Sequence, residues 1–234
     1  MRDIRALCDV VRRSEGRAPL VLDLGCGVGE RTCDFLEEGA WVTALDLSEE
    51  RLDRLLGRLD DPRWQSRCVL VRKDAAAYLE EIAAGMSSRF DVVAVGSLLR
   101  GVSDLPSFME SIASVLRPGG YLYLADLPLG AGDLERGGAA RGVVHGAVGI
   151  LDGILRCALR GAASGPSTDV RAGVSPREVR DAAGLAGLRE LFLGKRNRRA
   201  TAFASHLEND LLGALRPDRP GATRFTQCFR RGVA

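Results

Sequence analysis

The sequence predicts an α/β fold in which a doubly wound, mostly parallel sheet carries helices on both faces. Segments rich in β-favouring residues lie near residues 20–24, 41–46, 67–73, 91–96 and 120–126. Segments of helical periodicity alternate with them, near residues 30–38, 48–59, 75–84 and 105–116. Such alternation is typical of parallel strands joined by right-handed crossovers. A chain of 234 residues can form one such domain and leaves little for a second.

The first strand follows a short helix and ends in a glycine turn. The helix is expected near the N-terminus, where apolar residues recur at helical spacing, namely Ile4, Leu7, Cys8 and Val11. After the strand come Gly25, Gly27 and Gly29, and a helical pattern begins at once. Glycines in this position let the backbone approach a ligand closely, beside a helix N-terminus. The spacing is G-x-G-x-G, whereas the dinucleotide fingerprint is G-x-G-x-x-G.

Acidic residues at the ends of three strands restrict the ligand of this turn. Asp23 stands two residues before Gly25, where a carboxylate would repel a pyrophosphate but suit an ammonium group. Asp46 ends the second strand and can accept hydrogen bonds from both ribose hydroxyls. Asp74 ends the third strand and is expected near the adenine amino group if the first three strands are adjacent. S-adenosylmethionine fits these requirements, because it has an ammonium and a sulfonium but no phosphate.

In these features the chain resembles the class I S-adenosylmethionine-dependent methyltransferases. The matching segments are the glycine loop at 23–29, the two acids Asp46 and Asp74, the strand at 90–95 and the Leu-x-Pro-Gly-Gly turn at 116–120. The resemblance is close over residues 18–128 and loose over residues 175–234. It implies a Rossmann-like sheet of seven strands with an antiparallel last strand and a helical insert after strand five.

The resemblance also implies cofactor contacts at the ends of the first four strands. The implied contact residues are Asp23, Gly25, Cys26, Gly27, Gly29, Asp46, Leu47, Asp74, Ala75 and Ser97. Strand one is central in this topology, so its glycine loop is expected near the point where the strand order reverses.

We expect a single methyltransferase domain with four regions. These are an N-terminal helix at 1–17, a cofactor-binding core at 18–127, a candidate acceptor lid at 128–174 and C-terminal helices and strands at 175–234. In the lid, apolar residues between 144 and 159 fall at helical spacing. A lid and an ordinary packing helix both need one apolar face, so this pattern fits either interpretation.

The C-terminal region admits two arrangements. Ser175 and Pro176 predict a helix start, and a strand is expected near residues 188–193. Residues 202–205 could then form the returning last strand. We favour a helix at 199–215, ended by the prolines at 217 and 220, before an antiparallel last strand at 223–230.

The sequence offers no clear general base for methyl transfer. The reaction is an in-line displacement, in which holding the acceptor close and aligned can supply most of the acceleration. The candidates are His145 in the lid, because histidine is the side chain type that can change charge near neutral pH, Asp126 at the end of strand five, and Arg100, which could hold an acceptor carboxylate. Residues 96–100 lack the Asp/Asn-Pro-Pro-aromatic motif of nucleic-acid amino-methyltransferases. They also lack the acid of metal-dependent catechol-type enzymes and the histidine of plant-type O-methyltransferases.

Composition excludes several other classes. The net charge is only +2, and the basic residues, all but two of them arginine, are spread through the chain, so nucleic acid is not an expected partner. Six cysteines without a C-x-x-C pair and two histidines make a zinc site unexpected, so no metal is expected. We expect a reduced, cytoplasmic location, because neither a signal segment nor an apolar run of membrane-spanning length is present.

The sequence therefore predicts methyl transfer from S-adenosylmethionine to a small-molecule acceptor in a biosynthetic or tailoring pathway. One alternative is a protein or RNA acceptor, drawn to the basic cluster of Lys195, Arg196, Arg198 and Arg199. Another is a catalytically silent subunit that binds the cofactor and activates a partner. The acceptor, the methylated atom and the oligomeric state are left open.

Overall fold

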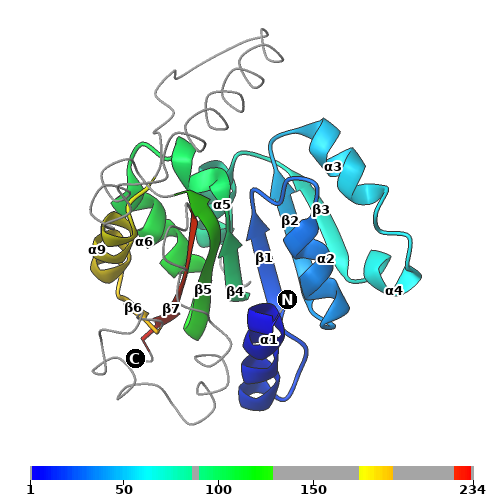
Figure 1. The fold of residues 1–234 in the computed structure, drawn as a ribbon, viewed down its shortest axis with the longest axis horizontal. Helices are drawn as coiled ribbons and strands as arrows, with labels where there is room; N and C mark the ends of the chain where they lie inside the picture. The colour runs from blue at the N-terminus through cyan, green and yellow to red at the C-terminus, as the bar shows by residue number, and fades with distance from the viewer. Residues whose placement is uncertain (1, 86–89, 129–173, 192–223, 233–234) are drawn as a thin grey trace, which may run out of the picture.

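The computed structural model describes residues 2–85, 90–128, 174–191 and 224–232 (Figure 1). In these residues a seven-stranded sheet has the order β3-β2-β1-β4-β5-β7-β6. The strands are β1 (Leu20–Leu24), β2 (Trp41–Asp46), β3 (Cys68–Arg72), β4 (Phe90–Val95), β5 (Leu116–Pro128), β6 (Leu188–Glu190) and β7 (Arg224–Arg231). Strands β1 to β5 pair in parallel, and β7 is antiparallel to both β5 and β6. The expected Rossmann-like, doubly wound α/β sheet is therefore confirmed.

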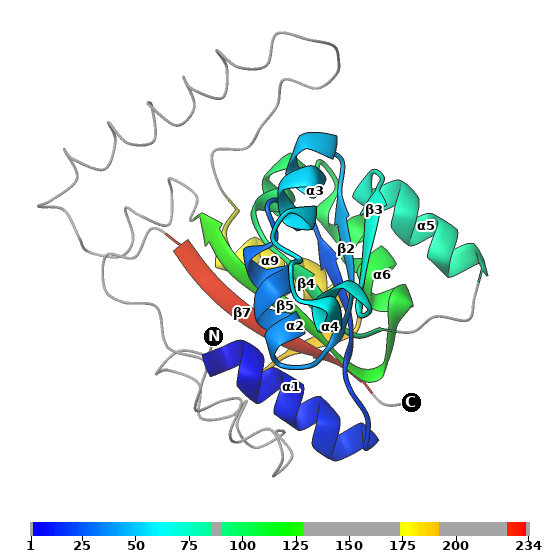
Figure 2. The ribbon, with the colours of Figure 1, turned by 90° about the vertical axis from the view of Figure 1, so that its right-hand side faces the viewer.

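Helices cover both faces of the sheet. They are α1 (Arg2–Glu15), α2 (Glu30–Glu37), α3 (Glu49–Leu56), α4 (Pro62–Gln65), α5 (Ala75–Gly85), α6 (Leu105–Val115) and α9 (Pro176–Leu185). Figure 2 shows α1 and α2 on one side of the strands and α5 and α6 on the other. Two apolar clusters fill the spaces between the layers, one with α1 and α2 and the other with α5, α6 and α9. All six residues of β4 are buried, as expected for a central parallel strand.

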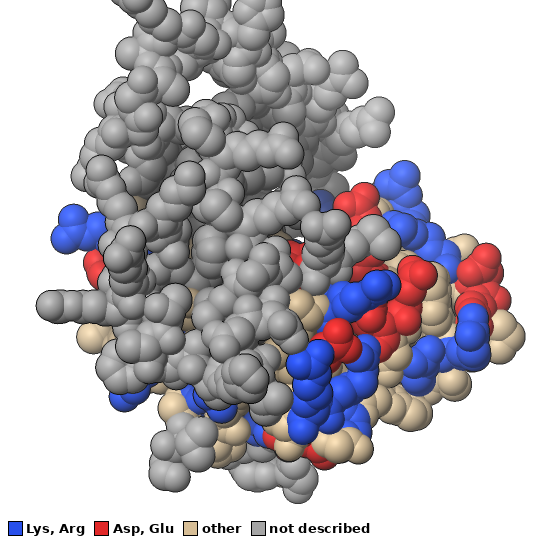
Figure 3. Space-filling model, turned by 60° about the horizontal axis from the view of Figure 1, so that its bottom comes forward, with Lys and Arg blue, Asp and Glu red and all other residues tan. Residues whose placement is uncertain are grey.

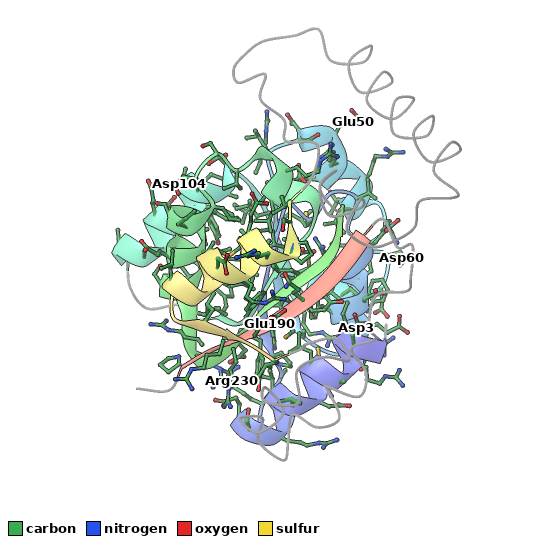
Figure 4. The ribbon with its side chains drawn as sticks, turned by 60° about the vertical axis from the view of Figure 1, so that its left-hand side comes forward. Asp3, Glu50, Asp60, Asp104, Glu190 and Arg230 are labelled. Carbon is green, nitrogen blue, oxygen red and sulfur yellow. The ribbon has the colours of Figure 1, made fainter. Side chains whose placement is uncertain are left out.

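Helix α1 is attached to the sheet by a partly buried polar contact. The Tyr123 hydroxyl of β5 donates a hydrogen bond to Asp3, which Figure 4 labels near the start of α1. Phe35 of α2 packs edge-on against the Tyr123 ring, with centroids 6.4 Å apart. Burial, together with the charge of Asp3, raises the pKa of Tyr123, so its hydroxyl keeps its proton and remains a donor.

Strand five is longer than the sequence predicts. Its expected start at residue 120 is wrong, because β5 begins at Leu116 and includes the Pro-Gly-Gly segment as an irregularity. Phe90 pairs with Leu116, whereas Val92 pairs with Tyr121, so the extra residues bulge out of register. A Cβ on Gly120 would lie 3.1 Å from the Asp91 carbonyl oxygen, so this segment packs directly against the β4 backbone.

Two short elements are additions to the predicted path. Helix α4 begins after Asp61, whose side chain accepts a hydrogen bond from the Arg63 amide. A 3-10 helix, η1 (Ser97–Gly101), follows β4. The expected lid at 128–174 and the expected helix at 199–215 lie almost wholly outside the described residues, as does the alternative strand at 202–205.

Candidate active site

The loop between β1 and α2 is built from three glycines in left-handed backbone conformations. Gly25, Gly27 and Gly29 have φ angles of 65°, 59° and 81°. Such angles are costly for residues that carry a Cβ, which explains the alternating glycines. The Cys26 amide donates to the Leu45 carbonyl of β2 at 2.9 Å, and the Gly29 amide donates to the Cys26 carbonyl at 3.0 Å. The loop is thus held against the neighbouring strand before any ligand binds.

The surroundings of these glycines differ. A Cβ on Gly25 would lie 3.0 Å from the Leu98 Cβ, and one on Gly29 would lie 2.1 Å from the Leu55 Cδ1. A Cβ on Gly27 would meet no atom within 4 Å. Gly25 and Gly29 are therefore packed by the protein itself, whereas the backbone at Gly27 faces open space and is accessible to a ligand.

Asp46 lies against this open part of the loop. Its Oδ2 accepts a hydrogen bond from the Gly27 amide and its Oδ1 accepts one from the Ser48 amide, both at 2.9 Å. The residue is 5% exposed, and the next residue, Leu47, is 66% exposed. Each carboxylate oxygen can accept more than one hydrogen bond. The Asp46 carboxylate is thus a fixed hydrogen-bond acceptor, suited to ribose hydroxyls, and the apolar Leu47 side chain beside it is suited to pack against a flat base.

Asp74 lies one strand farther along the same edge. Its Oδ1 accepts hydrogen bonds from the Ala76 and Ala77 amides, at 3.0 and 3.1 Å, at the start of α5. Ala75 is buried as the first residue of that helix. Because β2 and β3 are neighbours with Asp46 opposite Arg72, the two acids follow adjacent strand ends. The structure thus brings Asp46 and Asp74 to one edge, as the sequence predicts.

Asp23 faces the interior beneath the loop. It is fully buried, and its Oδ2 accepts a hydrogen bond from the Thr32 hydroxyl at 2.8 Å. Its Oδ1 accepts one from Arg31 Nη2 at 3.1 Å. Sequence reasoning did not single out Arg31 or Thr32. Both residues lie in the first turn of the helix that follows the loop. Side chains at such positions can reach back to the preceding strand, and this is the signal that would have indicated them.

The carboxyl end of β4 supplies the other side of the site. Leu98 of η1 packs against Gly25, and Ser97 begins η1, although its side chain is not described. Arg100 is half-buried, and its Nε has no hydrogen-bond partner among the described residues. Asp126 lies on β5 without a described side chain, and His145 lies outside the described residues. The three catalytic candidates are therefore not brought together by the described structure.

Burial favours the protonated form of the thiols near the loop. Burial raises the pKa of Cys68 to about 12, and burial also raises the pKa of Cys26 and of Cys33. Thiols that keep their protons are poor nucleophiles and poor metal ligands. Within the described residues, no group of three His, Cys, Asp or Glu side chains is placed to hold a metal ion. In the same part of the chain, no helix is both long and apolar enough to cross a membrane.

Comparisons with known proteins agree with this geometry. Residues 22–122 match the family described as a methyltransferase domain. The ubiquinone biosynthesis O-methyltransferase of Vibrio parahaemolyticus is 32% identical over 107 residues, which cover 46% of this chain and 43% of that protein. The protein of the same name from Xanthomonas axonopodis is 35% identical over 124 residues, which cover 50% and 47%. The chain thus matches less than half the length of these curated relatives.

A solved structure extends the similarity of fold. The glycopeptide N-methyltransferase MtfA, complexed with S-adenosyl-L-methionine, superimposes with a TM-score of 0.55 at 17% identity, covering 99% of this chain and 94% of that one. At this identity the likeness shows the fold alone. Residues 22–122 therefore match a methyltransferase domain, and they carry the glycine loop and the two acids at the ends of a Rossmann-like sheet.

Proposed function

We propose that this protein transfers a methyl group from S-adenosylmethionine to a small-molecule acceptor. The observation that carries the proposal is the pairing of Asp46 with the accessible backbone at Gly27. The Asp46 carboxylate is positioned by two backbone amides and has remaining acceptor capacity for the two ribose hydroxyls. Leu47 then covers one face of the adenine, and Asp74 accepts from its amino group.

The chemistry that follows depends on position more than on a reactive side chain. When bound, S-adenosylmethionine supplies an electrophilic methyl group on its sulfonium. The chain's own residues hold the acceptor in line with that group, an effect worth about 7–11 kcal/mol in well-oriented cases. We assign Arg100 to bind an anionic group of the acceptor, because its Nε is buried without a partner among the described residues. Asp126 and His145 remain our candidates for orienting or deprotonating the acceptor.

Two observations support a small-molecule acceptor. The curated relatives are named for ubiquinone biosynthesis and the structural neighbour for glycopeptide methylation, so neither name points to nucleic acid. On the face shown in Figure 3, the acidic and basic side chains of the described residues are intermixed rather than separated into a basic surface. We further propose a biosynthetic or tailoring pathway and a cytoplasmic location. The described cysteines, all thiols, support that location.

The first test is calorimetric titration of the wild-type protein with S-adenosylmethionine. We expect micromolar or tighter binding, weakened about 30-fold or more in Asp46→Ala, because the ribose hydroxyls lose charged acceptors. Asp53→Ala is the matched control, since Asp53 is an exposed acid on α3. Thermal unfolding without ligand shows whether each variant is folded. Absence of binding by the folded wild type would contradict the proposal, and binding would justify a screen of acceptors with a labelled methyl group.

A further inference from the structure

The side chain of Arg31 crosses from α2 to the end of β4. Its Nη2 donates to the Asp23 carboxylate on β1 at 3.1 Å. Its Nη1 lies against Gly96, immediately after β4, because a Cβ on Gly96 would be only 2.4 Å from that nitrogen. The guanidinium therefore spans the carboxyl ends of two neighbouring strands, β1 and β4.

This position is where the strand order reverses. β1 has β2 on one side and β4 on the other, and the sheet extends outward from these strands in both directions. In open α/β sheets, ligands bind outside the carboxyl ends of the strands at such a switch point. Arg31 thus presents a cation at the place where this fold binds its ligand.

The donors of Arg31 are largely unused. Its side chain is 16% exposed. Among the described residues, the contact with Asp23 is its one hydrogen bond, and its Nε has none. A guanidinium has five N–H donors, and burying these donors without hydrogen-bond acceptors costs free energy. An anion at the switch point would supply those acceptors.

Asp23 lies on the interior side of Arg31, away from the ligand position. It is fully buried, and each of its oxygens already accepts a hydrogen bond, one from Arg31 and one from Thr32. Because the carboxylate is fully buried against Arg31 and Thr32, a ligand ammonium could reach it only if these side chains moved aside. Asp23 therefore holds the guanidinium in place from below, and the group that faces the ligand is Arg31.

We infer that Arg31 binds the carboxylate of the methionyl group of the cofactor, with Asp23 as its positioning residue. The inference rests on the proposed function, which puts the adenine at Asp74 of the β3 end and the ribose at Asp46 of the β2 end. The amino-acid end of the same ligand then extends past β1 towards β4, because these strands follow one another in the sheet. A guanidinium and a carboxylate match each other in two parallel hydrogen bonds.

The test removes the carboxylate from the ligand as well as the arginine from the protein. Calorimetry compares S-adenosylmethionine with decarboxylated S-adenosylmethionine, which keeps the ammonium, on wild type and Arg31→Met. We expect Arg31→Met to weaken S-adenosylmethionine about 10- to 100-fold and the decarboxylated ligand less than about twofold. Arg63→Met, which removes an exposed arginine of α4, controls for net charge and should change neither affinity.

A second variant separates binding from folding. Arg31→Met leaves Asp23 charged and buried, so the double variant Asp23→Asn, Arg31→Met removes both charges, and thermal unfolding verifies that each protein is folded. The double variant should show the same ligand-selective loss. An equal loss for both ligands, or no loss, would overturn the assignment of Arg31. If the folded wild type bound neither ligand, the proposed function itself would fail, and the assignment with it.

Discussion

The three glycines of the loop after β1 share one backbone conformation but serve two different requirements. Gly29 has no room for a side chain, because Leu55, which is fully buried, occupies the space. Gly27 has room, yet its φ of 59° is also left-handed, and its amide is held by Asp46. The packing of the protein explains the first glycine, and access for a ligand explains the second.

Alanine at these two positions should separate stability from binding. Gly29→Ala adds a clash with Leu55 to backbone strain, so we expect the free energy of unfolding to fall by about 3 kcal/mol. Gly27→Ala adds strain alone, with an expected cost of about 1 kcal/mol, yet it should weaken cofactor binding because a methyl group enters the open space. Urea unfolding and calorimetry measure the two effects. Equal stability losses would contradict this account of the loop.

The positions of the two acids were predictable from the sequence, whereas their contacts with a cofactor stay predictions. Asp46 and Asp74 follow strands that any parallel order places at one edge, and the glycine pattern specifies its own backbone angles. The role expected for Asp23, contact with the ligand ammonium, remains a prediction, although its carboxylate is engaged by Arg31 and Thr32. That engagement was not predictable, because it depends on how the first turn of α2 docks over β1.

Among the elements, a buried carboxylate joins several segments at the amino-terminal edge of the sheet. Asp91 of β4 is fully buried and accepts two hydrogen bonds from Arg17, at 2.7 and 3.0 Å, and one from the Leu20 amide at 2.8 Å. Arg117 of β5 forms an ion pair with it at 2.5 Å and another with Glu15 of α1, also at 2.5 Å. This edge lies opposite the glycine loop.

Replacing this carboxylate should cost stability without affecting the site. We expect Asp91→Ala to lower the free energy of unfolding by about 3 kcal/mol, because the Leu20 amide and the largely buried Arg117 lose their acceptor, whereas Arg17 is 43% exposed and can bind water instead. Glu81→Ala, which removes an exposed ion pair with Lys73, should cost less than about 1 kcal/mol. Urea unfolding measures both. Cofactor affinity of folded Asp91→Ala should match wild type, and a marked loss would show that the two edges of the sheet are coupled.

The positions of helices and strands were predictable where the signal lies within the segment itself. Helical spacing predicted α3, and Ser175 with Pro176 predicted the start of α9. In the structure Ser48 and Ser175 cap these two helices. The start of β5 was not predictable, because the Pro-Gly-Gly segment reads as a turn in isolation. It joins the strand only because Gly120 packs against the β4 backbone. The residue pattern of one segment does not show which distant segment it will contact.

For the whole molecule, buried thiols link stability to pH. Burial raises the pKa of Cys8 to about 12, from an ordinary 9.0. Above pH 9 the unfolded chain therefore loses this proton while the folded chain keeps it. Ionisation then favours the unfolded state, so the contribution of Cys8 to stability is complete below pH 9 and declines as the pH rises towards 12.

The expected slope can be measured directly. Between pH 10 and 11, each such thiol should lower the free energy of unfolding by about 1.4 kcal/mol per pH unit. Cys8→Ala should therefore give a shallower decline than wild type, by about that amount, while the two proteins keep a constant difference between pH 7 and 8. Urea titrations with a reducing agent present provide the comparison. Parallel curves at high pH would show that Cys8 ionises equally in both states.

The mostly parallel sheet with its antiparallel last strand and the class of cofactor were predictable on the scale of the molecule, whereas the acceptor was not. The cofactor class follows from the glycine loop and the acids at adjacent strand ends, and these all lie within one continuous stretch of sequence. The acceptor depends on side chains such as Arg100, Asp126 and His145, which come from separate segments. Spacing along the chain does not specify how such segments meet.

The order of strands has a consequence for the synthesis of the chain. β7 follows β6 in sequence but lies between β5 and β6, pairing Tyr121 with Arg230 and Glu190 with Phe229. Glu190, labelled in Figure 4, also accepts a hydrogen bond from Gln227 of β7 at 2.8 Å. Before β7 has been synthesised, strands β1 to β5 can already pair with one another. The outer edge of β5 then has no partner, and β6 cannot join the sheet because its partner is β7. Exposed strand edges invite pairing with other chains, so a nascent chain is most prone to aggregate in this interval.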